Sequence, residues 1–144
     1  MCGIVGFLAR TPGLRHSLGE HVVPMLTCMG DRGPDSAGLA VFTDPLPEST
    51  RKFSLFAPTH DYDWDALQQR FRDDLTGELQ LTAVENHARL TTEVEPRRVR
   101  GWLLERAPEL HLLSVGRAIE MYKDEGHPRD IARRLGFTKL AGTH

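Results

Sequence analysis

The sequence predicts an α+β fold, in which strands and amphipathic helices share one hydrophobic core. Residues 51–57 alternate between apolar and polar side chains, which is typical of a strand with one buried face. Residues 63–75 instead carry an apolar side chain at every fourth position from Leu67, which is typical of a helix lying against a core. With 144 residues, the chain is long enough for one domain, residues 1–144, to enclose such a core.

The N-terminal part of the chain predicts a strand, a turn and a helix. Residues 3–9 are apolar and β-prone apart from their glycines, so we expect a buried first strand. Residues 10–13 contain Pro and Gly and predict a turn. A helix is expected over residues 17–29, because Ser17 and Glu20 have the spacing of a capping box. Within that helix, a proline either introduces a kink or marks the true first turn.

The next stretch predicts an irregular loop that leads into a strand. Two glycines, a proline and two acids exclude a regular element over residues 31–38. Residues 39–42 then form an apolar run that predicts a strand, and residues 51–57 are expected to pair antiparallel with it. Polar, glycine-rich loops beside buried strands often carry binding or catalytic side chains.

The second half of the chain predicts further strands and helices in alternation. We expect a strand over 78–86, a strand edge or loop over 87–95, a helix from Glu95-Pro96, a strand-like stretch over 111–122, and a helix from Gly126 to Leu135.

Composition and charge argue against several classes of protein, namely nucleic-acid-binding, membrane, secreted and metal-binding proteins. A formal net charge of −2 gives no general attraction to nucleic acid or to an anionic membrane. No apolar run approaches the length of a membrane span, and the N-terminus lacks the pattern of a secretory signal. Two cysteines are too few for a disulfide framework, and the seven histidines show no paired ligand spacing. We therefore expect a cytoplasmic protein without a metal or cofactor.

Cys2 has an unusual chemical option because it follows the initiator Met directly. If Met1 is removed, Cys2 carries a thiol with a reference pKa of about 8.5 and an α-amine with one of about 7.7–8.0. The amine can accept the thiol proton, so the nucleophile and its base reside in one residue. Gly3 adds no side chain that would obstruct a substrate carbonyl. The alternative is an ordinary buried cysteine at the start of a strand.

Arg32 is the second candidate, within the loop of residues 31–38. Its guanidinium is a fixed cation with forked donors, suited to a carboxylate or to bracing a catalytic loop. The alternative is that Arg32 pairs with Asp31 or Asp35 and only holds the turn. Cys28 has no basic neighbour in the sequence, and we expect a buried structural thiol there.

Four motifs together resemble the class II glutamine amidotransferase domain, which belongs to the N-terminal nucleophile hydrolases. They are Met-Cys-Gly-Ile-Val-Gly at residues 1–6, Asp-Arg-Gly-Pro-Asp-Ser-Ala-Gly at 31–38, and the stretches 115–123 and 126–131. Within that family the sequence is similar to the glutamate synthase and N-methylglutamate synthase branch. The two N-terminal motifs are specific as a pair, whereas either alone is a weak signal.

The resemblance implies a four-layer αββα fold, incomplete in this chain, which would be the N-terminal portion of the domain. It implies that Cys2 attacks the glutamine side-chain amide and forms a thioester, with Arg32 and Gly33 supporting the substrate site. Ammonia would pass to a synthase domain or subunit, in a hetero-oligomer. In the family, the arginine that grips the glutamine carboxylate and the oxyanion hole follow the counterpart of His144. We therefore expect negligible glutaminase turnover from the 144 residues alone.

Two other functions fit parts of the sequence. A non-catalytic, amidotransferase-like scaffold subunit would keep Met1, which blocks the α-amine. Proteins that crosslink abasic DNA also begin Met-Cys-Gly, but they continue with a basic residue where this chain has Ile4. They also lack the loop at residues 31–38.

Overall fold

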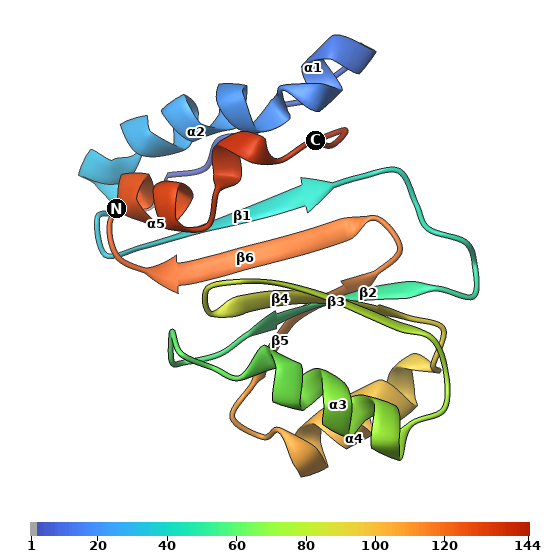
Figure 1. The fold of residues 1–144 in the computed structure, drawn as a ribbon. Coiled ribbons are helices and arrows are strands. Elements are labelled where there is room, and N and C mark those ends of the chain that lie inside the picture. The colour runs from blue at the N-terminus through green and yellow to red at the C-terminus, as the bar shows by residue number, and fades with distance from the viewer. Residues whose placement is uncertain (1–2) are drawn as a thin grey trace. The chain divides into compact units, whose positions relative to one another are not determined.

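The computed structural model describes residues 3–144, which form helices and antiparallel strands of a mixed α and β type (Figure 1). Contacts within the chain group into two compact units. One unit comprises the residues up to Asp44 together with Met121–His144, and the other comprises Pro45–Glu120. The α+β class expected from the sequence agrees with these elements.

The unit Pro45–Glu120 is built on a four-stranded antiparallel sheet with the order β3-β4-β2-β5. Two helices, α3 and α4, lie together on one side of this sheet (Figure 1). The elements are β2 (Arg51–Phe56), α3 (Trp64–Asp74), β3 (Leu79–Val84), β4 (His87–Thr92), α4 (Pro96–Arg106) and β5 (His111–Gly116).

The core of this unit lies between the sheet and the two helices. Phe53, Leu55 and Leu90 point from the central strands into it and are fully buried. Phe71 of α3 meets Trp102 of α4 edge to face, with their ring centroids 5.0 Å apart. Burying each such side chain contributes on the order of 1.5–3 kcal/mol, so apolar packing holds the helices on the sheet.

The other unit combines a two-stranded sheet, β1 with β6, and several helices. The two strands run in opposite directions (Figure 1). Leu26, Ile131 and Phe137 form a small apolar core between α2 and the C-terminal helices. The elements are α1 (Pro12–His16), α2 (Leu18–Cys28), the 3-10 turn η1 (Gly30–Arg32), β1 (Ser36–Phe42), β6 (Ile119–Glu125), α5 (Pro128–Arg134) and the 3-10 turn η2 (Phe137–Lys139).

The buried strand expected over residues 3–9 is wrong, because no strand forms in this stretch. Ile4 is 96% exposed and Leu8 is 58% exposed. Ala9, at the end of this stretch, makes one backbone hydrogen bond, in which its N–H donates to the carbonyl of Thr143 at 2.8 Å. An apolar run becomes a strand only when a second strand accepts and donates its backbone hydrogen bonds, and residues 3–8 make none that reach another segment of the described chain.

The helical region that follows starts earlier than expected. Thr11 accepts a hydrogen bond from the N–H of Leu14, and Pro12 occupies the first turn, so α1 forms where a turn was predicted. Ser17 makes no capping bond, because its hydroxyl donates instead to the carbonyl of Gly13. Pro24 lies inside α2, and Cys28, expected to be buried, is exposed at the end of that helix.

Strand pairing also differs from the prediction. β2 pairs with β4 and β5, whereas residues 39–42 belong to β1, which pairs with β6. The stretch 87–95, expected as an edge or loop, supplies the inner strand β4, with Ala88 and Leu90 buried. Alternation shows which face of a strand is buried but not which strand lies beside it, so the pattern alone could not choose these partners.

Among the helices of residues 3–144, none combines the length and apolar composition that crossing a bilayer requires.

Candidate active site

A cavity of about 880 Å³ lies in the unit that contains both ends of the chain. It is bordered by the N-terminal residues, the end of α2, the loop that follows η1, and strands β1 and β6. Arg32 and Gly33, the two support residues predicted from the sequence, both line it. Gly3, the residue that directly follows Cys2, lines the same cavity. Cys2 itself lies outside the described residues.

Arg32 is positioned by the short 3-10 turn that closes α2. Its backbone N–H donates to the carbonyl of Met29 at 3.0 Å, and the N–H of Gly33 donates to the carbonyl of Gly30 at 3.2 Å. The side chain of Arg32 is exposed and, within residues 3–144, makes no ion pair with Asp31 or Asp35. The alternative in which Asp31 or Asp35 neutralises Arg32 is therefore wrong, and the cation remains available to an anionic group in the cavity.

The start of the chain is placed against the end of α2. A Cβ added to Gly3 would lie 2.7 Å from the Sδ atom of Met29, closer than side chains approach one another. Gly3 therefore allows the backbone next to Cys2 to pass close to Met29 at the edge of the cavity. A side chain at position 3 would make the flexible Met29 side chain shift.

The loop between η1 and β1 is braced from the β6 side. The carbonyl of Asp35 accepts a hydrogen bond from the N–H of Gly126 at 2.8 Å. A Cβ on Gly38 would lie 2.9 Å from the carbonyl oxygen of Tyr122, so this glycine lets β1 approach β6 closely. A Cβ on Gly30 would lie 2.5 Å from Nε2 of His127, so the imidazole packs directly against the first residue of the turn that carries Arg32.

Strand β6 contributes residues that the sequence did not single out as site residues. Met121, Tyr122 and Lys123 line the cavity beside the Arg32 loop. These three residues belong to the stretch 115–123, which is one of the four motifs that resemble the family. The resemblance assigned no role to any residue of that stretch, so it did not identify them as site residues. Lys123 adds a second positive side chain to the cavity that contains Arg32.

A separate buried cluster of charges lies in the unit Pro45–Glu120. Lys52 Nζ is 2.7 Å from Glu120 Oε1, and an Arg89 guanidinium nitrogen is 3.0 Å from the same oxygen. Burial by itself raises the pKa of Glu120, but the hydrogen bond from Lys52 and the charges of Arg89 and Lys52 outweigh it, and the pKa is held below its usual range. This cluster ties β2 and β4 to the beginning of β6 and takes no part in the cavity.

We also searched the described residues for a set of side chains that could bind a metal ion. In the part of the chain that the structure describes, no three His, Cys, Asp or Glu side chains gather as ligands of a metal ion.

Comparison with known proteins gives two curated relatives. The glutamine amidotransferase-like protein GlxB of Rhizobium meliloti (strain 1021) is 30% identical over 146 residues, which cover 100% of this chain and 48% of that protein. A protein of Methanothermobacter thermautotrophicus, provisionally named a glutamine amidotransferase, is 27% identical over 155 residues, which cover 100% of this chain and 50% of that protein. The chain resembles glutamine amidotransferase-like proteins.

That similarity supports an amidotransferase-like domain. The chain spans about half the length of the curated relatives it matches. No family model and no solved structure matches it.

Proposed function

We propose that this chain carries the nucleophile of a class II glutamine amidotransferase and that Cys2 attacks the side-chain amide of glutamine. The observation that carries the proposal is the meeting of two distant motifs. Gly3, next to Cys2, lines the same cavity as Arg32 and Gly33, and the guanidinium of Arg32 makes no ion pair within residues 3–144. The names of the relatives support glutamine as the substrate.

The reaction follows from the chemistry of an N-terminal cysteine. The α-amine of Cys2 takes the thiol proton, and the thiolate adds to the amide carbon of glutamine. The carbon–nitrogen bond then breaks, the α-ammonium returns the proton to the departing nitrogen, and ammonia leaves a glutamyl thioester. Water hydrolyses the thioester to glutamate and regenerates the thiol. In this scheme Arg32 supports the site as a fixed positive charge at the cavity wall, suited to a substrate carboxylate or to bracing the loop beside Cys2.

Ammonia released in this way needs an acceptor. We infer that a synthase domain or subunit receives it, in a hetero-oligomer within the cytoplasm. The four-layer fold of the N-terminal nucleophile hydrolases is part of the same proposal. It is supported by the similarity to amidotransferase-like proteins and by the mixed α and β architecture.

The decisive experiment is alkylation by a diazoketone analogue of L-glutamine, followed by intact-mass measurement and peptide mapping. Cys28 is exposed and provides an internal control for unassisted thiol reactivity. We expect Cys2 to react at least about 100-fold faster than Cys28, because only Cys2 has an adjacent base. L-Glutamine should protect Cys2 and D-glutamine should not. A matched Arg32→Lys variant keeps the charge and should lose part of that protection, because the forked donors are gone.

Two outcomes would reject the proposal. The first is a mature protein that retains Met1, because the amine is then blocked and the scaffold function is favoured. The second is equal labelling of Cys2 and Cys28. An adduct between Cys2 and abasic single-stranded DNA, visible on a denaturing gel, would favour DNA crosslinking instead.

A further inference from the structure

Strand β3 forms one edge of the four-stranded sheet, and its outer side has no partner. β3 pairs only with β4, from Leu79 opposite Thr92 to Val84 opposite His87. No other backbone hydrogen bond reaches residues 79–84 within the described chain. Gln80, Thr82 and Ala83 are exposed along this edge. Unpaired backbone groups in an extended row form a template for a further strand.

The edge lacks the features that usually prevent such pairing. Its sequence, Leu-Gln-Leu-Thr-Ala-Val, contains no charged residue, no proline and no glycine, and no irregularity interrupts its register with β4. Val84, near the end of the strand, is 40% exposed. Six consecutive residues of this kind are long enough for a stable strand pair.

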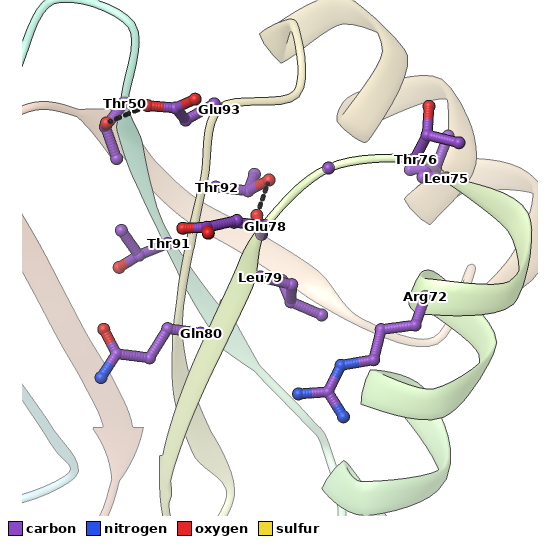
Figure 2. A pocket seen from close by; sticks show the side chains of 11 residues that line it. Thr50, Arg72, Leu75, Thr76, Glu78, Leu79, Gln80, Thr91, Thr92 and Glu93 are labelled. Carbon is purple, nitrogen blue, oxygen red and sulfur yellow. Dashed lines mark hydrogen bonds between the residues drawn. The ribbon is translucent and has the colours of Figure 1, made fainter.

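Opposite charges flank the two ends of the edge. Arg72 of α3 lies beside Leu79 at the start of β3, where both line a surface cavity of about 740 Å³ (Figure 2). The Arg72 guanidinium makes no ion pair within residues 3–144. Glu85 directly follows the other end of the strand, and its carboxylate likewise makes no ion pair there. Glu78 and Glu93 also line this cavity, and Figure 2 shows both carboxylates away from the Arg72 guanidinium. On the side of β3 that carries Arg72, a cation at the start and Glu85 after the end make the edge complementary to its own antiparallel copy.

We propose that β3 pairs antiparallel with β3 of a second copy of this chain, centred on Thr82. The two-fold axis of such a pair stands perpendicular to the sheet, so the helix-covered faces of both copies coincide. Leu79 and Leu81 point to the helix-covered face, where they pack against the core. Odd-numbered residues of one copy must therefore lie opposite odd-numbered residues of the other.

This rule on odd and even positions decides which charged residues can lie opposite one another across the interface. A register that sets Glu78 against Glu85 is excluded, because it would pair an even position with an odd one. Centring on Thr82 sets Leu79 opposite the turn residue Glu85 of the second copy and so brings that carboxylate close to Arg72. Two equivalent Arg72–Glu85 contacts then form, and the hairpin turn of each copy occupies the cavity of the other. The two sheets become one continuous sheet across the interface.

The first test measures self-association by sedimentation equilibrium, with an expected dimer Kd on the order of 10–100 µM because a single strand pair makes a small interface. Arg72→Glu and Glu85→Arg should each raise this Kd at least about tenfold by placing like charges together. The double variant should return to within about threefold of the wild-type Kd. Arg100→Glu is the matched control: it makes the same charge change at an exposed position of α4 and should leave the Kd unchanged.

The second test fixes the register in a Cys2→Ser, Cys28→Ser background. Thr82→Cys should form a disulfide-linked dimer under mild oxidation, because residues directly opposite have Cβ atoms about 4.5–5.5 Å apart. Leu81→Cys should not, since Leu81 then faces Ala83 of the second copy. A monomer at all concentrations up to about 1 mM overturns the interface, and crosslinking of Leu81→Cys alone overturns the register. Both readouts are independent of Cys2 chemistry, so they stand apart from the proposed amide hydrolysis.

Discussion

The contact between Gly30 and His127 offers a direct test of how the Arg32 loop is held. A Cβ at position 30 would lie 2.5 Å from Nε2 and 2.7 Å from Cε1 of His127, where carbon and nitrogen atoms normally stay beyond 3.4 Å. Gly30 is buried, so the added methyl group cannot move into solvent. Gly30→Ala must therefore displace either the imidazole or the 3-10 turn that ends at Arg32.

We expect Gly30→Ala to lower the free energy of unfolding by about 1–3 kcal/mol, the usual cost of overpacking. The imidazole also accepts a hydrogen bond from the N–H of Arg129 at 3.2 Å and so caps α5. His127→Asn keeps a capping oxygen and removes much of the ring. The double variant should therefore be more stable than the sum of the two single changes predicts, by about 1 kcal/mol or more.

Urea unfolding followed by circular dichroism measures this coupling. Gly13→Ala is a suitable control, because nothing lies within 4 Å of a Cβ built there and that site is unrelated to the loop. The reasoning is refuted if Gly30→Ala costs the same free energy in the wild-type and His127→Asn backgrounds. The alkylation rate of Cys2, measured on the same variants, shows whether the displaced turn also disturbs the cavity.

Three further predictions concern the other unit. Phe71→Ala should lower the free energy of unfolding by about 3–5 kcal/mol, because the ring is fully buried and packs against Trp102; a loss below about 1 kcal/mol would contradict the core described above. Because folding lowers the pKa of Glu120 from its reference value of 4.5, the carboxylate adds stability above that pH and the contribution is lost as pH falls through the lower folded pKa. The unfolding free energy of Glu120→Gln should accordingly depend less on pH in that acidic range, and an identical pH profile would argue against the ion cluster. Burial, the Glu109 hydrogen bond and the Glu109 charge raise the pKa of Tyr62 to about 12, so in a Tyr122→Phe background, ultraviolet titration should show ionisation well above the usual value of 10.0.

The helices of this protein could be predicted largely from local signals. Asp63 accepts a hydrogen bond from the N–H of Ala66 at the start of α3, and Pro96 and Pro128 occupy the first turns of α4 and α5. These signals act within one turn of chain, so the sequence contains them in full. The same kind of signal misled at Ser17, where a nearby carbonyl competed for the hydroxyl.

The candidate site was predicted in its parts and assembled only by the fold. Cys2 and Arg32 stood out because an N-terminal thiol and a glycine-rich loop have recognisable chemistry. Nothing in their spacing indicated that β6, nearly ninety positions after Arg32, would supply Lys123 to the same cavity or that His127 would pack beneath the turn.

The sequence by itself determined the α+β class, the first turns of α4 and α5, the buried face of β2 and the two motifs of the candidate site. Tertiary structure decided which strands are neighbours, that residues 3–9 form no strand, that Cys28 is exposed, and that the charge of Arg32 is left unpaired by its acidic neighbours. The physical reason is the range of the interactions. Capping and alternation act over a few residues, whereas a strand, a cavity or an ion pair exists only when a distant segment arrives to complete it.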